Sequence, residues 1–272
     1  MLIFLLAVGL SLIFGLMDVL NFAHGGLFAW GAFFGIWAYG KTGSFGLGIL
    51  GAIIIGIILG FLMERLIIKP VYGNHIQQIL ITLGVMLVLS EMLKVVWGAN
   101  PIAAKTPDWL EGSWSVASLV FIKYRMFVIL IGAIVFAAVM FLMKKTRFGL
   151  IIRAGVMDKE MVQALGIDVR KIFMMTFMFG AALAALGGVL LGPYSGVIYS
   201  DMGAQYNILA FIVVVIGGMG SVSGTLLAAL LISIIGAFMA YYVPDLSLAV
   251  NMLIMALVLL FKPTGLFKAG DA

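Results

Sequence analysis

The most suggestive ionisable residues lie in a short polar break between two apolar runs. Asp18, Asn21 and His24 occupy positions i, i+3 and i+6 within Gly15–Gly26. If the segment is helical, these side chains lie along one side of it. Ionisable groups inside a membrane are candidates for substrate or gating roles. The alternatives are a solvated Asp18, a His24 that hydrogen-bonds freed backbone, and an Asn21 that caps a helix beginning at Phe22.

A second break, Gly217–Gly224, consists mostly of glycine and serine and also separates two apolar runs. Irregular backbone is tolerated at membrane depth only where protein or a polar cavity satisfies it. Discontinuous helices of this kind lie near the path in many transporters. The two breaks predict two similar, parallel modules, and the alternative is that glycine merely permits close packing. The residues assigned to a translocation pathway are Asn21, Phe22, Ala23, His24, Gly25, Gly217, Gly218, Gly220 and Ser221.

One long polar loop interrupts the apolar sequence in its middle. Seven of the sixteen Lys and Arg residues lie between Lys144 and Lys171. Within this loop, Met157–Leu165 is patterned as a short helix, which Asp158 favours at its N-terminus and Gly166 is suited to end. A loop of this size and charge is expected to engage a cytosolic partner.

The composition is that of a membrane protein. The chain is 64% hydrophobic and 10% charged, and its mean hydropathy is +1.25. It has no cysteine, and its two histidines have no zinc-binding spacing. No H-E-x-x-H motif and no cluster of serine, histidine and aspartate is present, so an enzyme is disfavoured. The net charge of +5 lies in loops that flank apolar runs, which argues against nucleic-acid binding.

The apolar runs predict an all-α, polytopic transmembrane bundle of eight or nine membrane segments with discontinuous helices. The short run Ile208–Ile216 decides the number, because it either crosses or only enters the bilayer. The other expected spans are Met1–Leu16, Phe22–Tyr39, Phe45–Met63, Ile76–Trp97, Tyr124–Met143, Ile172–Leu191, Thr225–Tyr242 and Leu246–Phe261.

Loop charge favours nine crossings. The segments Glu64–His75, Lys144–Lys171 and the tail from Lys262 hold eleven of the sixteen cations and should face the cytoplasm. All three lie on one side only if the short run crosses. Met1 and Lys41 then lie outside. No signal peptide is expected, because the start is apolar without a basic region. The alternative to a helix that starts at Met1 is a first helix that begins upstream of it.

Five motifs in order resemble the membrane permeases of branched-chain amino acid ABC importers. The resemblance extends over nearly the whole chain, and Val162 departs from it at a position where alanine is common. The matching motifs are Ser11–Gly25, with Asn21–Gly25 most recognisable; Met63–Arg65 with Lys69-Pro70 and Thr82–Gly84; Arg153-Ala154 with Asp158 and Leu165–Ile167; Gly217–Ser221 with Gly224; and Lys262–Leu266.

The resemblance implies one transmembrane permease domain over residues 1–272, with the cytoplasmic coupling loop within 144–171. It implies half of a pathway, completed by a homologous second permease subunit. Two cytoplasmic ATPase subunits would bind ATP and Mg²⁺, this chain would need no cofactor, and an extracytoplasmic solute-binding protein would deliver the solute. The coupling residues would be Arg153, Ala154, Asp158, Leu165, Gly166 and Ile167.

The implied function is ATP-driven import of branched-chain amino acids, or of a related small polar solute such as urea, an amide or an aromatic acid. The implied location is the plasma (inner) membrane of a bacterium or archaeon, in contact with lipid. The alternative is a stand-alone channel or secondary transporter for a small polar solute, whose glycine-rich breaks form a filter. The outer segment 98–123 would be either a docking surface for the binding protein or an ordinary surface loop.

Overall fold

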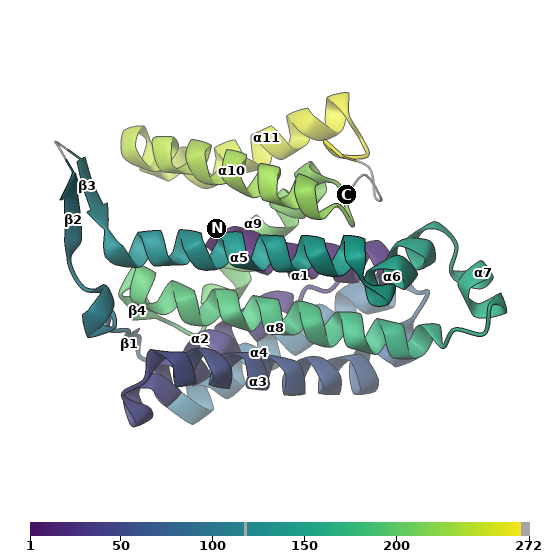
Figure 1. Cartoon of the computed structure of the whole chain (residues 1–272), viewed down its shortest axis with the longest axis horizontal. Helices are drawn as coiled ribbons and strands as arrows, with labels where there is room; N and C mark the ends of the chain where they lie inside the picture. The colour runs from purple at the N-terminus through teal and green to yellow at the C-terminus, as the bar shows by residue number, and fades with distance from the viewer. Residues whose placement is uncertain (117–118, 268–272) are drawn as a thin grey trace.

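The computed structural model describes residues 1–116 and 119–267, and its helices run mostly along one common direction (Figure 1). Long apolar stretches form these helices because a backbone in lipid must satisfy its own hydrogen bonds. The helices are α1 Leu2–Met17, α2 His24–Thr42, α3 Phe45–Met63, α4 His75–Trp97, α5 Lys123–Lys145, α6 Arg147–Met157, α7 Lys159–Ala164, α8 Val169–Ser195, α9 Met202–Gly217, α10 Val222–Tyr242 and α11 Ser247–Phe261.

Helix α8 forms the centre of the bundle. It packs against α1, α2 and α3, and 72% of its most apolar window is buried. Glycine allows this close packing: a Cβ added at Gly9 on α1 would lie 2.5 Å from the carbonyl oxygen of Gly180 on α8. Small residues at helix contacts let backbones approach in a membrane, where no hydrophobic force drives helices together. The abundant glycine therefore stabilises the core.

The two ends of the bundle differ in structure. At one end, β1 Ile102–Ala103 pairs antiparallel with β4 Val197–Ile198, and β2 Ser113–Val116 pairs with β3 Leu119–Ile122. Helices α6 and α7 project at the opposite end (Figure 1). Loop charge predicts that the strand end lies outside and the α6–α7 end lies in the cytoplasm, and we name the two ends accordingly. The strands were not predicted, because the sequence pattern of segment 98–123 shows only a mixed polar loop.

The predicted membrane helices are present, with changed boundaries. Five described helices are long and apolar enough to cross a membrane, namely α3 with its extension to Val71, α4, α5, α8 and α10. The run Ile208–Ile216 is the inner part of the longer helix α9. Near the start of α9, Asp201 lies 3.6 Å from Lys94 at the outer end of α4. At its other end, α9 meets the C-terminal tail. Helix α9 has 16 residues and is one of the shorter apolar helices, so the count of nine crossings stays a prediction.

Candidate functional site

The first break is a non-helical segment that folds back into the bundle. Helix α1 ends at Met17, and Asp18 adopts a left-handed conformation with a φ of 55°. The chain is then non-helical until α2 begins at His24. The Nε2 atom of His24 lies 3.2 Å from the carbonyl oxygen of Leu6. Since a helix rises about 1.5 Å per residue, the segment retraces much of the length of α1.

The three polar residues of this break do not line one side of a helix, so that prediction is wrong. Asp18 is exposed at the end of α1, whereas Asn21 and His24 are fully buried. The Oδ1 atom of Asn21 accepts a hydrogen bond from the backbone N–H of Ala23 at 3.1 Å. Asn21 therefore stabilises the turn before α2, and this helix begins two residues later than the sequence suggested.

Side chains from two other helices satisfy the backbone of the break. On α9, the Oδ1 atom of Asn207 accepts from the N–H of Gly25 at 3.0 Å, and its Nδ2 atom donates to the carbonyl of Phe22 at 2.9 Å. On α4, the Oγ1 atom of Thr82 accepts from the N–H of Phe22 at 3.1 Å. Buried backbone groups need such partners. The non-helical segment is therefore stable inside the bundle because α4 and α9 supply its hydrogen bonds.

The start of α2 also packs directly on α9. A Cβ added at Gly25 would overlap the carbonyl oxygen of Gly203 and lie 2.6 Å from the Cβ of Asn207. The rings of Phe22 and Phe211 stack with their centroids 4.6 Å apart. The break, α2 and α9 therefore form one closely packed unit in which only glycine fits at position 25.

Asn207→Leu should strongly destabilise the protein. It leaves the N–H of Gly25 and the carbonyl of Phe22 without partners, at about 1–3 kcal/mol each. For a chain of this size we expect the thermal midpoint in detergent to fall by roughly 5–15 °C. Gln205→Leu is the matched control, because Gln205 is exposed on the same helix. Equal midpoints for the two variants would contradict the assignment of Asn207.

The second break has tighter turns. Gly218 and Gly220 have φ values of 96° and 83°, a conformation that favours glycine. The N–H of Gly220 donates to the Oγ atom of Ser11 on α1 at 3.1 Å. The Oγ atom of Ser221 accepts from the N–H of Gly224 at 3.1 Å and so caps α10. The sequence indicated a break here, but it is shorter than predicted: α9 includes Gly217, and α10 begins at Val222 with Ser221 as its N-cap, three residues before the expected Thr225.

The C-terminal tail closes the second break at the cytoplasmic end. The N–H of Leu266 donates to the carbonyl of Ile216 at 2.8 Å, and that of Phe267 donates to Gly217 at 3.2 Å. These bonds satisfy carbonyls at the end of α9 that the helix itself leaves free. Of the two tail cations, Lys268 lies outside the described residues.

Both breaks contact α1, but at different heights. The first break reaches Leu6 through the side chain of His24. In the second break, the N–H of Gly220 donates to Ser11, and the Cα of Gly220 would lie 2.5 Å from a Cβ added at Gly15. These contacts join each break to α1 rather than to the other break. Asn21, His24 and Ser221 are fully buried within this subunit. Their assignment to a pathway stays a prediction.

The cytoplasmic loop contains the predicted short helix as α7. The Oδ1 atom of Asp158 caps it by accepting from the N–H of Met161 at 2.9 Å. Gly166 ends it with a φ of 79°. A second helix, α6, precedes it and was not predicted separately. Of the other coupling residues, Arg153 and Ala154 lie on α6, and Ile167 leads into α8.

Apolar side chains project from this loop into solvent. Large exposed apolar residues outside the membrane are typical of protein interaction surfaces. Together with the caps at both ends of α7, they give the loop a defined, partly apolar face. The exposed fractions are 88% for Met157, 59% for Met161 and 72% for Leu165.

One stretch matches the letters of a nucleotide phosphate-binding loop. Gly35–Thr42 fits the pattern G-x-x-x-x-G-K-[ST]. That motif works only as a loop between a strand and a helix N-terminus. Here the stretch forms the C-terminal half of α2, where the helix dipole disfavours phosphate. The match therefore does not make a phosphate site.

The sequence analysis missed the residues that hold the first break. Thr82 appeared only as part of a motif, and Asn207 lay just outside the short apolar run Ile208–Ile216 and was given no role. A signal for Asn207 does exist, because an amide inside the apolar run of α9 needs a buried partner. No sequence pattern shows that this partner lies 185 residues away.

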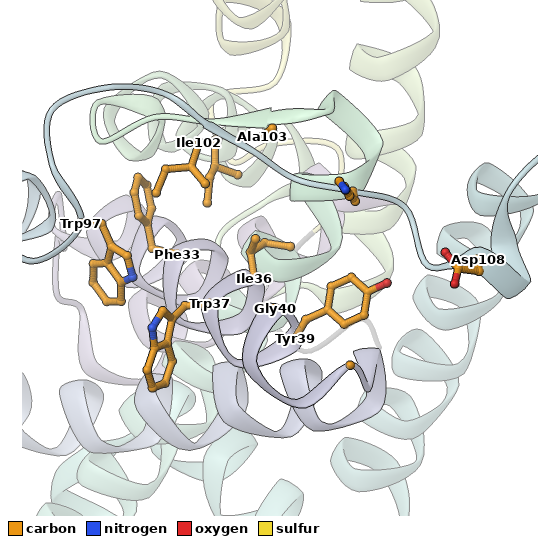
Figure 2. Close-up of a pocket in the computed structure, with 12 residues that line it drawn as sticks. Phe33, Ile36, Trp37, Tyr39, Gly40, Trp97, Ile102, Ala103 and Asp108 are labelled. Carbon is orange, nitrogen blue, oxygen red and sulfur yellow. The ribbon is translucent and has the colours of Figure 1, made fainter.

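A pocket of about 650 Å³ opens at the outer end between α2, the end of α4 and strand β1 (Figure 2). Its walls combine aromatic rings with one cation and one carboxylate, as small-molecule sites often do. The apolar rings, the cation and the carboxylate offer contacts for a small apolar molecule that carries both charges. The aromatic and charged lining residues are Phe33, Trp37, Tyr39, Trp97, Lys105 and Asp108.

Comparison with known proteins gives a consistent result. A family model described as "Branched-chain amino acid transport system / permease component" matches residues 1–261. The chain is 28% identical to the high-affinity branched-chain amino acid transport system permease protein LivH of Escherichia coli K12, over 96% of this chain and 90% of LivH. It is 30% identical to the corresponding permease protein BraD of Pseudomonas aeruginosa, with the same coverage.

A weaker similarity reaches a differently named permease. The chain is 27% identical to the probable branched-chain amino acid transport permease protein LivM of Methanocaldococcus jannaschii, over 81% of this chain and 69% of LivM. No solved structure matches the chain. The similarities therefore come from permease sequences alone.

Proposed function

Because the chain belongs to the family of branched-chain amino acid transport system permease components, we propose that it carries a branched-chain amino acid across the plasma (inner) membrane of a bacterium or archaeon. It is a multi-pass permease subunit of an ABC importer and a transport protein rather than an enzyme. Branched-chain amino acids are the substrates that the names of the related permeases give. For this chain, the aromatic and charged lining of the outer pocket supports the same substrate class.

The observation that carries the proposal is the extent of the family match. It runs through residue 261, which is the last residue of α11, and so includes every described helix. Both polar breaks and the cytoplasmic loop lie within it. A match of this extent covers the whole helical bundle.

We place half of the pathway in this subunit. A homologous second permease subunit would supply the other half, and similarity to both LivH and LivM supports such a pairing. The pathway would include the two breaks, 21–25 and 217–221, because irregular backbone interrupts the helices at both. A change in how α2 packs on α9 would then open the buried polar groups of the first break.

We assign the cytoplasmic loop to coupling. Helix α7, capped by Asp158 and ended by Gly166, would dock in a groove of a separate ATPase subunit. Met161 and Leu165 would enter that groove, because both are exposed and apolar. ATP and Mg²⁺ would bind to the ATPase subunits, and a solute-binding protein would deliver the amino acid to the outer end.

The substrate assignment is tested by ATPase stimulation in the complete reconstituted importer. Leucine, isoleucine or valine, each with the binding protein, should raise ATP hydrolysis at least fivefold over the rate without substrate. Urea, acetamide and phenylalanine should raise it less than twofold. If one of these solutes stimulates hydrolysis more than the branched-chain amino acids do, the substrate is a different one and the permease role stands.

A further inference from the structure

A basic pocket lies at the cytoplasmic ends of α3 and α8. After Met63, α3 continues as a π-helical turn, η1 Glu64–Ile68, and a 3-10 turn, η2 Lys69–Val71. The first of these turns contacts α8, and an open pocket of about 240 Å³ lies between the turns and the start of α8. Its lining includes four cations and two carboxylates. The lining residues are Glu64, Arg65, Lys69, Asp168, Arg170, Lys171 and Met174.

The two carboxylates already have partners. Glu64 is buried and its Oε1 atom accepts from the hydroxyl of Tyr72 at 2.6 Å. Asp168 lies 3.4 Å from the Nζ atom of Lys171. The backbone N–H of Lys171 also lowers the pKa of Asp168, so this carboxyl is ionised at neutral pH.

The remaining cations are exposed and point to an anionic ligand. Within the described part of the chain, no ion pair forms for Arg65, Lys69 or Arg170. They come from two segments about a hundred residues apart in sequence. The general tendency of Lys and Arg to lie on the cytoplasmic side requires only that these cations lie in inner loops. It does not require that they converge on one small cavity.

The surface beside the pocket is apolar. Leu62 and Leu66 on the α3 side are 43% and 66% exposed, and Met175 on α8 is 50% exposed. Leu66 and Met175 follow the lining residues Arg65 and Met174 in sequence, so a cationic pocket and exposed apolar side chains occur together at the ends of two membrane helices. A phospholipid has one part for each: a charged headgroup and apolar acyl chains. Basic pockets between transmembrane helices on the cytoplasmic side bind anionic headgroups, and arginine binds phosphate through two parallel hydrogen bonds.

We propose that this pocket binds the phosphate headgroup of an anionic phospholipid of the inner leaflet, with its acyl chains along Leu62, Leu66 and Met175. The phosphate would lie among Arg65, Lys69 and Arg170. A lipid in this site would contact the start of α8, and α8 is the helix that follows the coupling loop in sequence. Lipid bound there would hold this end of α8 in place.

Native mass spectrometry of the purified chain tests the proposal, with phosphatidylglycerol and phosphatidylcholine offered at equal concentration in detergent. The wild-type chain should retain phosphatidylglycerol at least tenfold over phosphatidylcholine. The triple variant Arg65→Gln, Lys69→Gln, Arg170→Gln should lose that preference. The control Lys41→Gln, Lys105→Gln, Lys123→Gln removes the same charge from the outer side and should keep it.

Two further arms identify the source of the phosphate and guard against misfolding. Inorganic phosphate at 10 mM should not displace the lipid, and displacement would instead indicate a site for free phosphate. The single variant Arg170→Gln, at an exposed position, should reduce retention at least threefold if the triple variant does not fold. Equal loss of the preference in the outer control would overturn the proposal. None of these outcomes depends on which solute is transported.

Discussion

Replacing Gly25 by alanine should reduce ATP-driven uptake by the reconstituted importer at least tenfold. The added Cβ would overlap the carbonyl oxygen of Gly203 and lie 2.6 Å from the Cβ of Asn207. Both contacts belong to α9, and the first is backbone that cannot rotate away. Overpacking of this kind costs about 1–3 kcal/mol. It also moves the start of α2, with the first break, away from Asn207.

The matched control for this variant is Gly84→Ala. Gly84 lies in the middle of α4, and an added Cβ there meets no atom within 4 Å. Uptake should stay within twofold of wild type, since alanine also favours helix. Size-exclusion chromatography of each variant separates lost transport from lost folding. Equal uptake by the two variants would show that the approach of α2 to α9 does not matter for transport.

Gly56 would be a poor control, although its mid-helix position in the sequence suggests only a minor packing contact or a lipid-facing site. An added Cβ there would lie 2.7 Å from the Cβ of Ala185 and 2.8 Å from the carbonyl oxygen of Ala181. Gly56 is thus part of the contact between α3 and α8. A larger residue at this position would disturb the core of the bundle.

Met161→Asp should uncouple ATP hydrolysis from transport. Met161 is 59% exposed on α7, so the change leaves the fold intact while it places a charge where an apolar contact is proposed. Uptake by the complete importer should fall at least tenfold, and substrate should no longer stimulate ATP hydrolysis. Gln163→Asp introduces the same charge at an exposed polar position of the same helix and should change both less than threefold.

Uptake and stimulation should be measured on the same vesicles. Normal uptake by Met161→Asp would exclude α7 as the docking element. Changes at the ends of α7 should act through its caps: Asp158→Lys removes the hydrogen bond to the N–H of Met161, and a bulky residue at Gly166 is strained by its positive φ. These changes should therefore weaken coupling by unwinding the helix.

Much of the helical architecture followed from local pattern. Apolar runs long enough to cross lipid became helices, and Asp158 and Gly166 marked the ends of α7 because capping depends on residues close in sequence. The glycine-rich breaks were also recognisable, since glycine is concentrated where the backbone leaves the helix.

What the sequence did not show depends on distant contacts. The stretch 18–23 has helical spacing of polar residues, yet it is non-helical, because Thr82 and Asn207 supply hydrogen bonds that a helix would otherwise provide. Local propensity carries no information about partners 60 and 185 residues away. Strand β1 was not predicted for the same reason, because it pairs with β4, which is about 95 residues away in sequence (Ile102 opposite Ile198).

The central claim is that this chain is half of a pathway that works only with its partners. Leucine uptake should be measured in liposomes that contain either this chain alone or the complete importer with binding protein outside and ATP inside. The complete importer should accumulate leucine against its gradient, and the chain alone should not exceed protein-free liposomes. Rapid leucine flux through the chain alone, without ATP, would contradict the account and identify a self-sufficient channel or transporter.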